Sequence, residues 1–159
     1  MTSSNPLRQL EELGQSIWID FIRRGMISSG ELQRLIDDDG VSGVTSNPSI
    51  FEKAMVESND YDSAISSLKI AGKRVEEIYQ TLTVEDIQSV AEVLRPTYNR
   101  QQGTDGYVSL EVSPKLAHDT HGTIDEARHL WAEVNRPNTF IQVPATSEGL
   151  LAIQQLEKL

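Results

Sequence analysis

The sequence predicts an α/β fold in which four parallel strands alternate with helices. Four short runs rich in β-branched and aromatic residues are typical of strands, and segments with a helical spacing of apolar residues separate them; the runs are residues 16–20, 41–45, 107–112 and 139–143. Consecutive parallel strands need crossover segments, which helices supply, so this alternation favours a parallel sheet. A polar side chain also stands at or beside the carboxyl end of each run, the edge at which parallel sheets bind ligands.

The first part of the chain is expected to form two helices, one on either side of the first strand. Asn5 can cap the first helix and Gly14 can end it, and its apolar face consists of Leu7, Leu10 and Leu13. The strand at 16–20 ends in a carboxylate. A second helix follows the serine pair at 28–29, ends at the acidic turn 37–40, and buries Leu32, Leu35 and Ile36.

The long segment between the second and third strands has a helical pattern, with breaks expected near 58–59 and 81–83. Thr83 and Asp86 fit a capping box, in which a hydroxyl and a carboxylate satisfy backbone N–H groups at the start of a helix. Pro96 interrupts the pattern, because proline removes a helical hydrogen bond. We therefore expect several helices here rather than one.

The rest of the chain predicts the last two strand–helix units. A helix at 124–134 follows the third strand, and in the connection before it His118 and Asp119 suit a capping pair better than a proton relay. A capping residue at 146–147 opens the final helix, expected at 148–159.

Composition narrows the class of protein. The chain has 159 residues, enough for one domain over residues 1–159, and 14 Lys and Arg against 24 Asp and Glu give a net charge of −10. This acidity argues against binding of nucleic acid or anionic membranes. Cysteine is absent and the three histidines form no metal motif. No apolar run is long enough to span a membrane and no leader is evident, so we expect a cytoplasmic protein.

Glu111 is the strongest sign of a functional site that the residues give by themselves. Alternation along the third strand places Ser109 and Glu111 on one face, and Val108, Leu110 and Val112 on the other. A carboxylate that faces the interior is costly to bury unless a hydrogen-bonding or charged partner meets it. Such a residue is more typical of a site than of a core.

Four sequence blocks, in order, carry a resemblance to a known family: residues 16–20 (SIWID), 43–53 (GVTSNPSIFEK), 107–119 (YVSLEVSPKLAHD) and 137–146 (PNTFIQVPAT). Together they resemble the N-terminal part of bacterial transaldolases, over residues 7–159. The resemblance implies a (β/α)8 TIM barrel of the pentose phosphate pathway that needs no cofactor. Such an enzyme moves a dihydroxyacetone unit from a ketose phosphate, sedoheptulose 7-phosphate or fructose 6-phosphate, to an aldose phosphate through a lysine Schiff base.

The resemblance also assigns roles to individual residues. It implies that Asp20 is the acid/base at the C4 hydroxyl of the sugar, that Asn47 and Thr45 bind the substrate, and that Glu111 moves protons through a water. The Schiff-base lysine of the family falls on Gln142. An amide nitrogen shares its lone pair with the carbonyl, so Gln142 cannot form an imine, and we expect the chain to be inactive or very weak.

Simpler structural interpretations stand beside these roles. Asp20 and Asn47 could each cap the segment that follows, and Gln142 could be a satisfied interior amide. Without the lysine, Glu111 lacks its nearest expected cation, so burial should raise the pKa of Glu111, and we expect it to hydrogen-bond Gln142 or a water.

The chain also supplies about four strand–helix units where the family pattern has eight. A half barrel leaves both edge strands open and one apolar sheet face uncovered. Either two copies associate to cover these edges, or the gene is truncated. The two hypotheses for function are accordingly a transaldolase that uses sugar phosphates, and a non-catalytic half barrel that acts by interaction.

Overall fold

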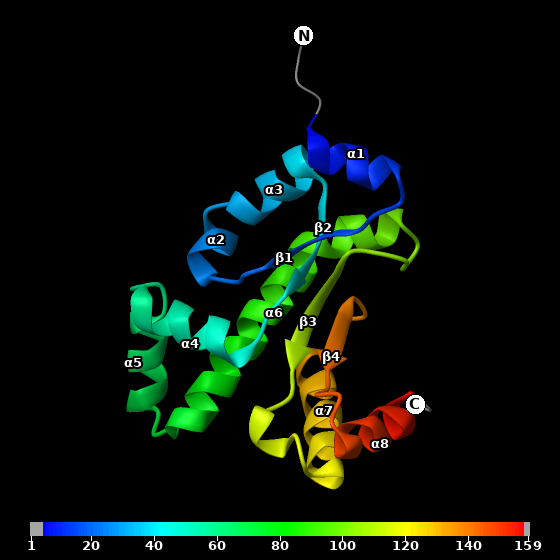
Figure 1. Ribbon diagram of the computed structural model, residues 1–159. Coiled ribbons are helices and arrows are strands. Elements are labelled where there is room, and N and C mark those ends of the chain that lie inside the picture. The colour runs from blue at the N-terminus through cyan, green and yellow to red at the C-terminus, as the bar shows by residue number, and fades with distance from the viewer. Residues whose placement is uncertain (1–4, 158–159) are drawn as a thin grey trace.

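A computed structural model describes residues 5–157 and contains one four-stranded parallel sheet in the order β1-β2-β3-β4 (Figure 1). The strands are β1 (Ile17–Asp20), β2 (Val41–Thr45), β3 (Tyr107–Glu111) and β4 (Thr139–Gln142). Each strand pairs in parallel with the next in the sequence. The predicted α/β class and all four strands are confirmed.

Helices precede, connect and follow the strands of the sheet. They are α1 (Pro6–Glu12), α2 (Arg24–Ser28), α3 (Glu31–Asp39), α4 (Pro48–Glu57), α5 (Asp62–Ile70), α6 (Val75–Arg100), the 3-10 turn η1 (Pro114–Leu116), α7 (Thr120–Val134) and α8 (Ser147–Leu156). None of the helices within residues 5–157 is long and apolar enough to span a membrane.

The core lies between the sheet and the helices behind it. Val44 and Val108 from the central strands are about 1% and 0% exposed, and they belong to one buried cluster with apolar residues of α3, α6 and α7, among them Ile36, Leu94 and Leu130. Removal of this apolar surface from water is the main stabilising term of such a layered fold. One face of the sheet is therefore fixed by packing.

The opposite face of the sheet is open, and it is aromatic only toward the amino ends of the strands. Phe140 stacks on Tyr107 with ring centroids 4.0 Å apart and on Trp18 at 6.4 Å, and it remains 47% exposed. Gly43 lets the Trp18 ring lie against the backbone, since a Cβ there would approach the ring to 2.2 Å. Toward the carboxyl ends this face carries the polar residues of the predicted site, so the expected uncovered apolar face is apolar in part only.

Helix α6 differs most from the prediction. It runs without a break from Val75 to Arg100, so the expected interruptions at 81–83 and at Pro96 are wrong. Leu82, Ile87 and Leu94 are fully buried along it, and this burial outweighs the local helix-breaking signals.

The capping box expected at Thr83 and Asp86 is also wrong. Both residues lie buried inside α6, and the carboxylate that helps to cap this helix belongs to Glu77, which accepts a hydrogen bond from the backbone N–H of Arg74 at 2.8 Å. The predicted break near 58–59 is confirmed, because α4 ends at Glu57.

Side-chain caps at three other helix starts agree with the sequence. Asn5 accepts from the backbone N–H of Leu7 at 2.9 Å, Asp119 from Gly122 at 2.9 Å and Thr146 from Gly149 at 3.0 Å. Helix α7 begins at Thr120, four residues before the predicted start. Residues 158–159 of the predicted final helix lie outside the described residues.

Candidate active site

The four strands each end in one of the polar residues predicted for the site. Asp20, Thr45, Glu111 and Gln142 are the last residues of β1, β2, β3 and β4. Asp20 lies beside Thr45 in the β1–β2 register, and Glu111 lies beside Gln142 in the β3–β4 register. Because residues in register on parallel strands point to the same face, the four side chains share the open face of the sheet.

Asp20 is held by a neighbouring strand. The Thr45 hydroxyl donates a hydrogen bond to Asp20 Oδ1 at 2.7 Å, and both side chains lie at the carboxyl edge of the sheet. Asp20 is exposed, so this bond orients the carboxylate without removing it from solvent. Asp20 caps no helix: α2 begins four residues later, after Arg23.

Asn47 lies two residues beyond β2 and caps α4. Its Oδ1 accepts a hydrogen bond from the backbone N–H of Ile50 at 3.0 Å. The capping interpretation is therefore correct for this residue. Its side-chain Nδ2 makes no hydrogen bond within residues 5–157, which leaves a donor at the edge of the site.

Glu111 is half-buried, and its pKa is raised, first by burial and second by the charge of Asp20. The predicted direction of this pKa change is confirmed. Within the described part of the chain no lysine or arginine forms an ion pair with Glu111. Its carboxyl group therefore has a stronger tendency to hold a proton than an ordinary glutamate.

Gln142 is exposed and its amide carbonyl is engaged by Ser109. The Ser109 hydroxyl, which is 2% exposed, donates to Gln142 Oε1 at 3.0 Å. The expected hydrogen bond between Glu111 and Gln142 does not form within residues 5–157, although the two residues lie side by side in the strand register: the Gln142 carbonyl accepts from Ser109 instead. The alternative partner of Glu111, a water, stays a prediction. The amide is partly satisfied, as the simpler interpretation held, but it is not interior.

Similarity to known proteins agrees with this geometry. Residues 17–159 match the family model described as Transaldolase/Fructose-6-phosphate aldolase. The chain belongs to this family.

Curated transaldolases are similar along nearly the whole chain. A transaldolase from Thiobacillus denitrificans is 46% identical over 155 residues, which are 98% of this chain and 43% of that protein. One from Thermobifida fusca is 50% identical over 149 residues, and Transaldolase 2 from Nostoc punctiforme is 44% identical over 154; each match covers 40% of the relative. The chain thus spans about two fifths of the length of these relatives. The transaldolase family has the TIM-barrel fold, so the four-stranded sheet is part of such a barrel.

Tyr79 is a residue near the transaldolase-like site that the sequence did not indicate. Burial raises the pKa of Tyr79, a nearby Thr83 hydroxyl lowers it, and the charges of Glu52 and Glu111 raise it further. The charge of Glu111 is the smallest of these influences on the pKa of Tyr79, which lies on α6. Spacing by four residues puts Tyr79 and Thr83 on one helix face, but the break expected at 81–83 concealed this signal.

Other candidates lie elsewhere. His118 contacts Glu148 at 3.3 Å near the start of α8, while its neighbour Asp119 caps α7, so the two form no relay. No group of three or more metal-ligating side chains occurs among residues 5–157. A surface hollow of about 590 Å³ is lined by Arg24, Asp86 and Arg136 on the helix side, and none of the predicted site residues lines it.

Proposed function

We propose that the chain is the N-terminal part of a transaldolase-like protein that binds the dihydroxyacetone portion of a ketose phosphate without a covalent bond. The observation that carries this proposal is an amide, Gln142, at the end of β4, in register with Glu111 and hydrogen-bonded to Ser109. Carboxylate, hydroxyl and amide groups at this edge suit the hydroxyl groups of a sugar.

The residue at position 142 decides whether imine chemistry can occur. A lysine Nζ would attack the ketose carbonyl carbon, and loss of the carbonyl oxygen as water would leave an iminium that accepts the electron pair of the breaking C–C bond. Gln142 has no free lone pair on nitrogen, so this bond does not form. We expect transfer activity to fall by several orders of magnitude, as when a catalytic nucleophile is removed.

The other polar side chains of the site can still accept and donate protons. Asp20, oriented by Thr45, can accept a hydroxyl proton, and the raised pKa of Glu111 makes it a suitable proton donor through a water. Asn47 Nδ2 can donate to a sugar hydroxyl. We place this binding function in the pentose phosphate pathway and in the cytoplasm.

Borohydride reduction tests the proposal directly. The chain is incubated with fructose 6-phosphate and sodium borohydride, and its intact mass is measured; no three-carbon adduct is expected. Gln142→Lys restores the amine and is expected to give an adduct at position 142, whereas Gln142→Met, similar in length and unable to react, is the matched control. A three-carbon adduct on any lysine of the unaltered chain would overturn the proposal.

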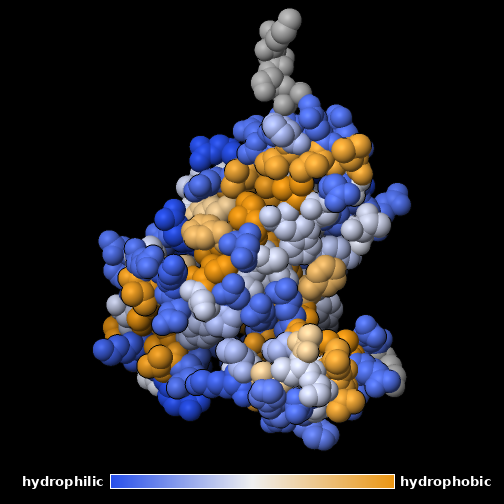
Figure 2. Space-filling model, viewed as in Figure 1, coloured by the Kyte–Doolittle hydropathy of each residue, from blue (hydrophilic) through white to orange (hydrophobic). Residues whose placement is uncertain are grey.

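A second candidate function is a non-catalytic partial barrel that associates with itself. It is favoured by large apolar side chains that are exposed in the segments next to the two edge strands in the sequence: Leu13 before β1 is 76% exposed, and Leu150 and Leu151 on α8, after β4, are 57% and 55% exposed. Figure 2 shows apolar surface near α1 and near α8. Light scattering over a range of concentrations tests this candidate, which requires a mass of at least two chains.

A further inference from the structure

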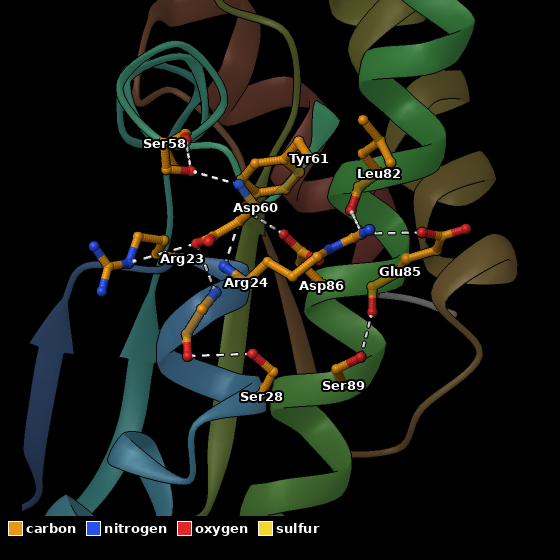
Figure 3. Close-up of polar contacts among 12 residues, drawn as sticks. Arg23, Arg24, Ser28, Ser58, Asp60, Tyr61, Leu82, Glu85, Asp86 and Ser89 are labelled. Atoms are coloured by element: carbon orange, nitrogen blue, oxygen red, sulfur yellow. Dashed lines mark hydrogen bonds and ion pairs between the residues drawn. The ribbon is translucent and has the colours of Figure 1, made fainter. Parts of the chain in front are cut away.

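A largely buried polar network lies at the start of α2, the helix that follows β1. Arg24, the first residue of α2, donates from Nε to Asp86 Oδ1 at 2.7 Å and from Nη2 to Glu85 at 2.9 Å. Tyr61 donates its hydroxyl proton to Asp86 Oδ2 at 2.7 Å, and the Arg24 guanidinium lies 5.0 Å from the centre of the Tyr61 ring. Figure 3 shows these side chains converging from α2, the α4–α5 connection and α6.

Two side chains at the centre of this network are buried. The Asp86 side chain is 2% exposed and Tyr61 is 0% exposed. Burial raises the pKa of Asp86, while the Tyr61 hydroxyl and Arg24 lower it, and burial also raises the pKa of Tyr61. A buried ion pair is weak evidence of stability, because apolar residues of similar shape often stabilise a fold as well or better. The network therefore calls for an explanation other than stability.

The network holds the backbone that follows Asp20. The backbone N–H of Arg24 donates to the Tyr61 hydroxyl at 3.1 Å, and that of Gly25 donates to Asp60 Oδ2 at 2.9 Å. These N–H groups lie at the start of α2, where a helix has no internal acceptors for them. Tyr61 thus accepts from the backbone of α2 and donates to Asp86 of α6 through one oxygen atom.

Asp20 has few other restraints. Within residues 5–157 it ends an edge strand whose one neighbour is β2, and Phe21 after it is 45% exposed. Beyond the Thr45 hydrogen bond, the chain is next fixed at Ile22, which is 1% exposed, and at Arg24. Arg24 lies four positions after Asp20, so a shift of the Arg24 backbone is transmitted over a span of at most about 14 Å.

We propose that Arg24, Tyr61 and Asp86 are positioning residues that hold the Asp20 carboxylate at a fixed separation from Glu111. This inference rests on the proposed function only for the chemical role of Asp20; the geometric claim is independent of any sugar. If the network is weakened, the end of β1 relaxes and Asp20 moves away from Glu111.

The carboxyl titration of Glu111 reports that separation, because the charge of Asp20 contributes to it. We would label the glutamate side-chain carboxyl carbons with carbon-13 and follow Glu111 by NMR in the absence of sugar. Tyr61→Phe removes the hydroxyl that joins Arg24 to Asp86 and keeps the ring. As a single change, Tyr61→Phe is expected to lower the titration midpoint of Glu111. In a chain that already carries Asp20→Asn, it is expected to leave this midpoint unchanged.

Two further variants complete the experiment. Arg24→Lys keeps the positive charge but loses the planar group that contacts both Asp86 and Glu85, and it is expected to cause a smaller shift in the same direction. Tyr107→Phe is the matched control, since it removes a phenolic hydrogen bond of equal length, 2.7 Å to the Gly103 carbonyl, at the amino end of the sheet. We expect it to leave the Glu111 midpoint in place.

A merely structural network would give a different result. Equal shifts with and without Asp20→Asn, or no shift in folded Tyr61→Phe and Arg24→Lys, would overturn the inference. Sugar phosphate binding, measured separately by calorimetry on the unaltered chain, tests the proposed function instead, so the failure of one does not imply the failure of the other.

Discussion

At the scale of single residues, Glu111 combines partial burial with the influence of the Asp20 charge, and both raise its pKa. A carboxyl group whose pKa is raised in the folded state favours folding in its protonated form, so its contribution is fully present below the ordinary pKa and is lost as pH rises through the raised value. Glu111→Gln removes this charge. We therefore expect it to increase the free energy of unfolding at pH 7 and to have little effect near pH 4.

Urea unfolding at both pH values checks this prediction, and Glu76→Gln, an exposed position on α6, is the control. An equal effect of Glu111→Gln at the two pH values would contradict it. An increase in stability after replacement of Glu111 would also agree with the general observation that functional residues often make a fold less stable.

Residue-scale prediction succeeded where a repeating pattern carried the information. Alternation along β3 indicated that Ser109 and Glu111 share a face, and the register with β4 agrees. The Ser109–Gln142 hydrogen bond could not be predicted, because one residue of register decides which side chains meet across strands. Asp86 was misread since its local spacing fits a cap, whereas its partners, Arg24 and Tyr61, are 62 and 25 residues away.

At the scale of elements, α6 places Pro96 inside a continuous helix, four residues before its end. Proline lacks the N–H that would bond to the carbonyl of Glu92 and is less favourable than alanine in a helix interior by about 3 kcal/mol. Pro96 is exposed, so its replacement creates no cavity. We expect Pro96→Ala to stabilise the chain by roughly 1–3 kcal/mol, with the urea midpoint as the measurement.

Asn99→Ala, an exposed change one turn further along α6, is the control and should alter stability by no more than about 0.5 kcal/mol. Destabilisation by Pro96→Ala would mean that the fixed proline backbone contributes more through the unfolded state than it loses in the helix. Pro96 also explains why a break in α6 was wrongly predicted. The proline can be read from the local sequence, whereas the burial of Leu94 and Thr97 on either side depends on tertiary packing.

At the scale of the whole molecule, alternation of strand and helix patterns was sufficient for the fold class, and the family match extends it to part of a TIM barrel. The character of the open face was harder to predict. Its aromatic part depends on Trp18, Tyr107 and Phe140 meeting across strands far apart in sequence, and on Gly43, which makes room for the Trp18 ring. Sequence periodicity predicts which face of the sheet each side chain points to. It does not predict how the side chains of different strands pack together.

The two open edges of the sheet give a prediction about assembly. β1 and β4 run in the same direction, so β4 of one chain can pair in parallel with β1 of a second chain. If both edges pair in this way, two chains related by a two-fold axis form a closed barrel of eight strands. We expect such closure to cover Leu13, which precedes β1, and Leu150, on the helix that follows β4; both are exposed. If self-association is the function, Leu150→Lys should weaken it at least tenfold, because a charge would then be buried at the junction.

Analytical ultracentrifugation measures this dissociation constant, and Val56→Lys is the matched control, because Val56 is 78% exposed and lies on α4, which follows the inner strand β2. Equal weakening by the two variants would indicate non-specific apolar contact rather than edge pairing. Edge pairing also joins β4 of one chain to β1 of the other, so it would bring Gln142 close to Asp20 of the second copy. A dimer formed in this way would hold two sets of the same polar groups around one axis, and weakening it by Leu150→Lys should then reduce sugar phosphate binding in parallel.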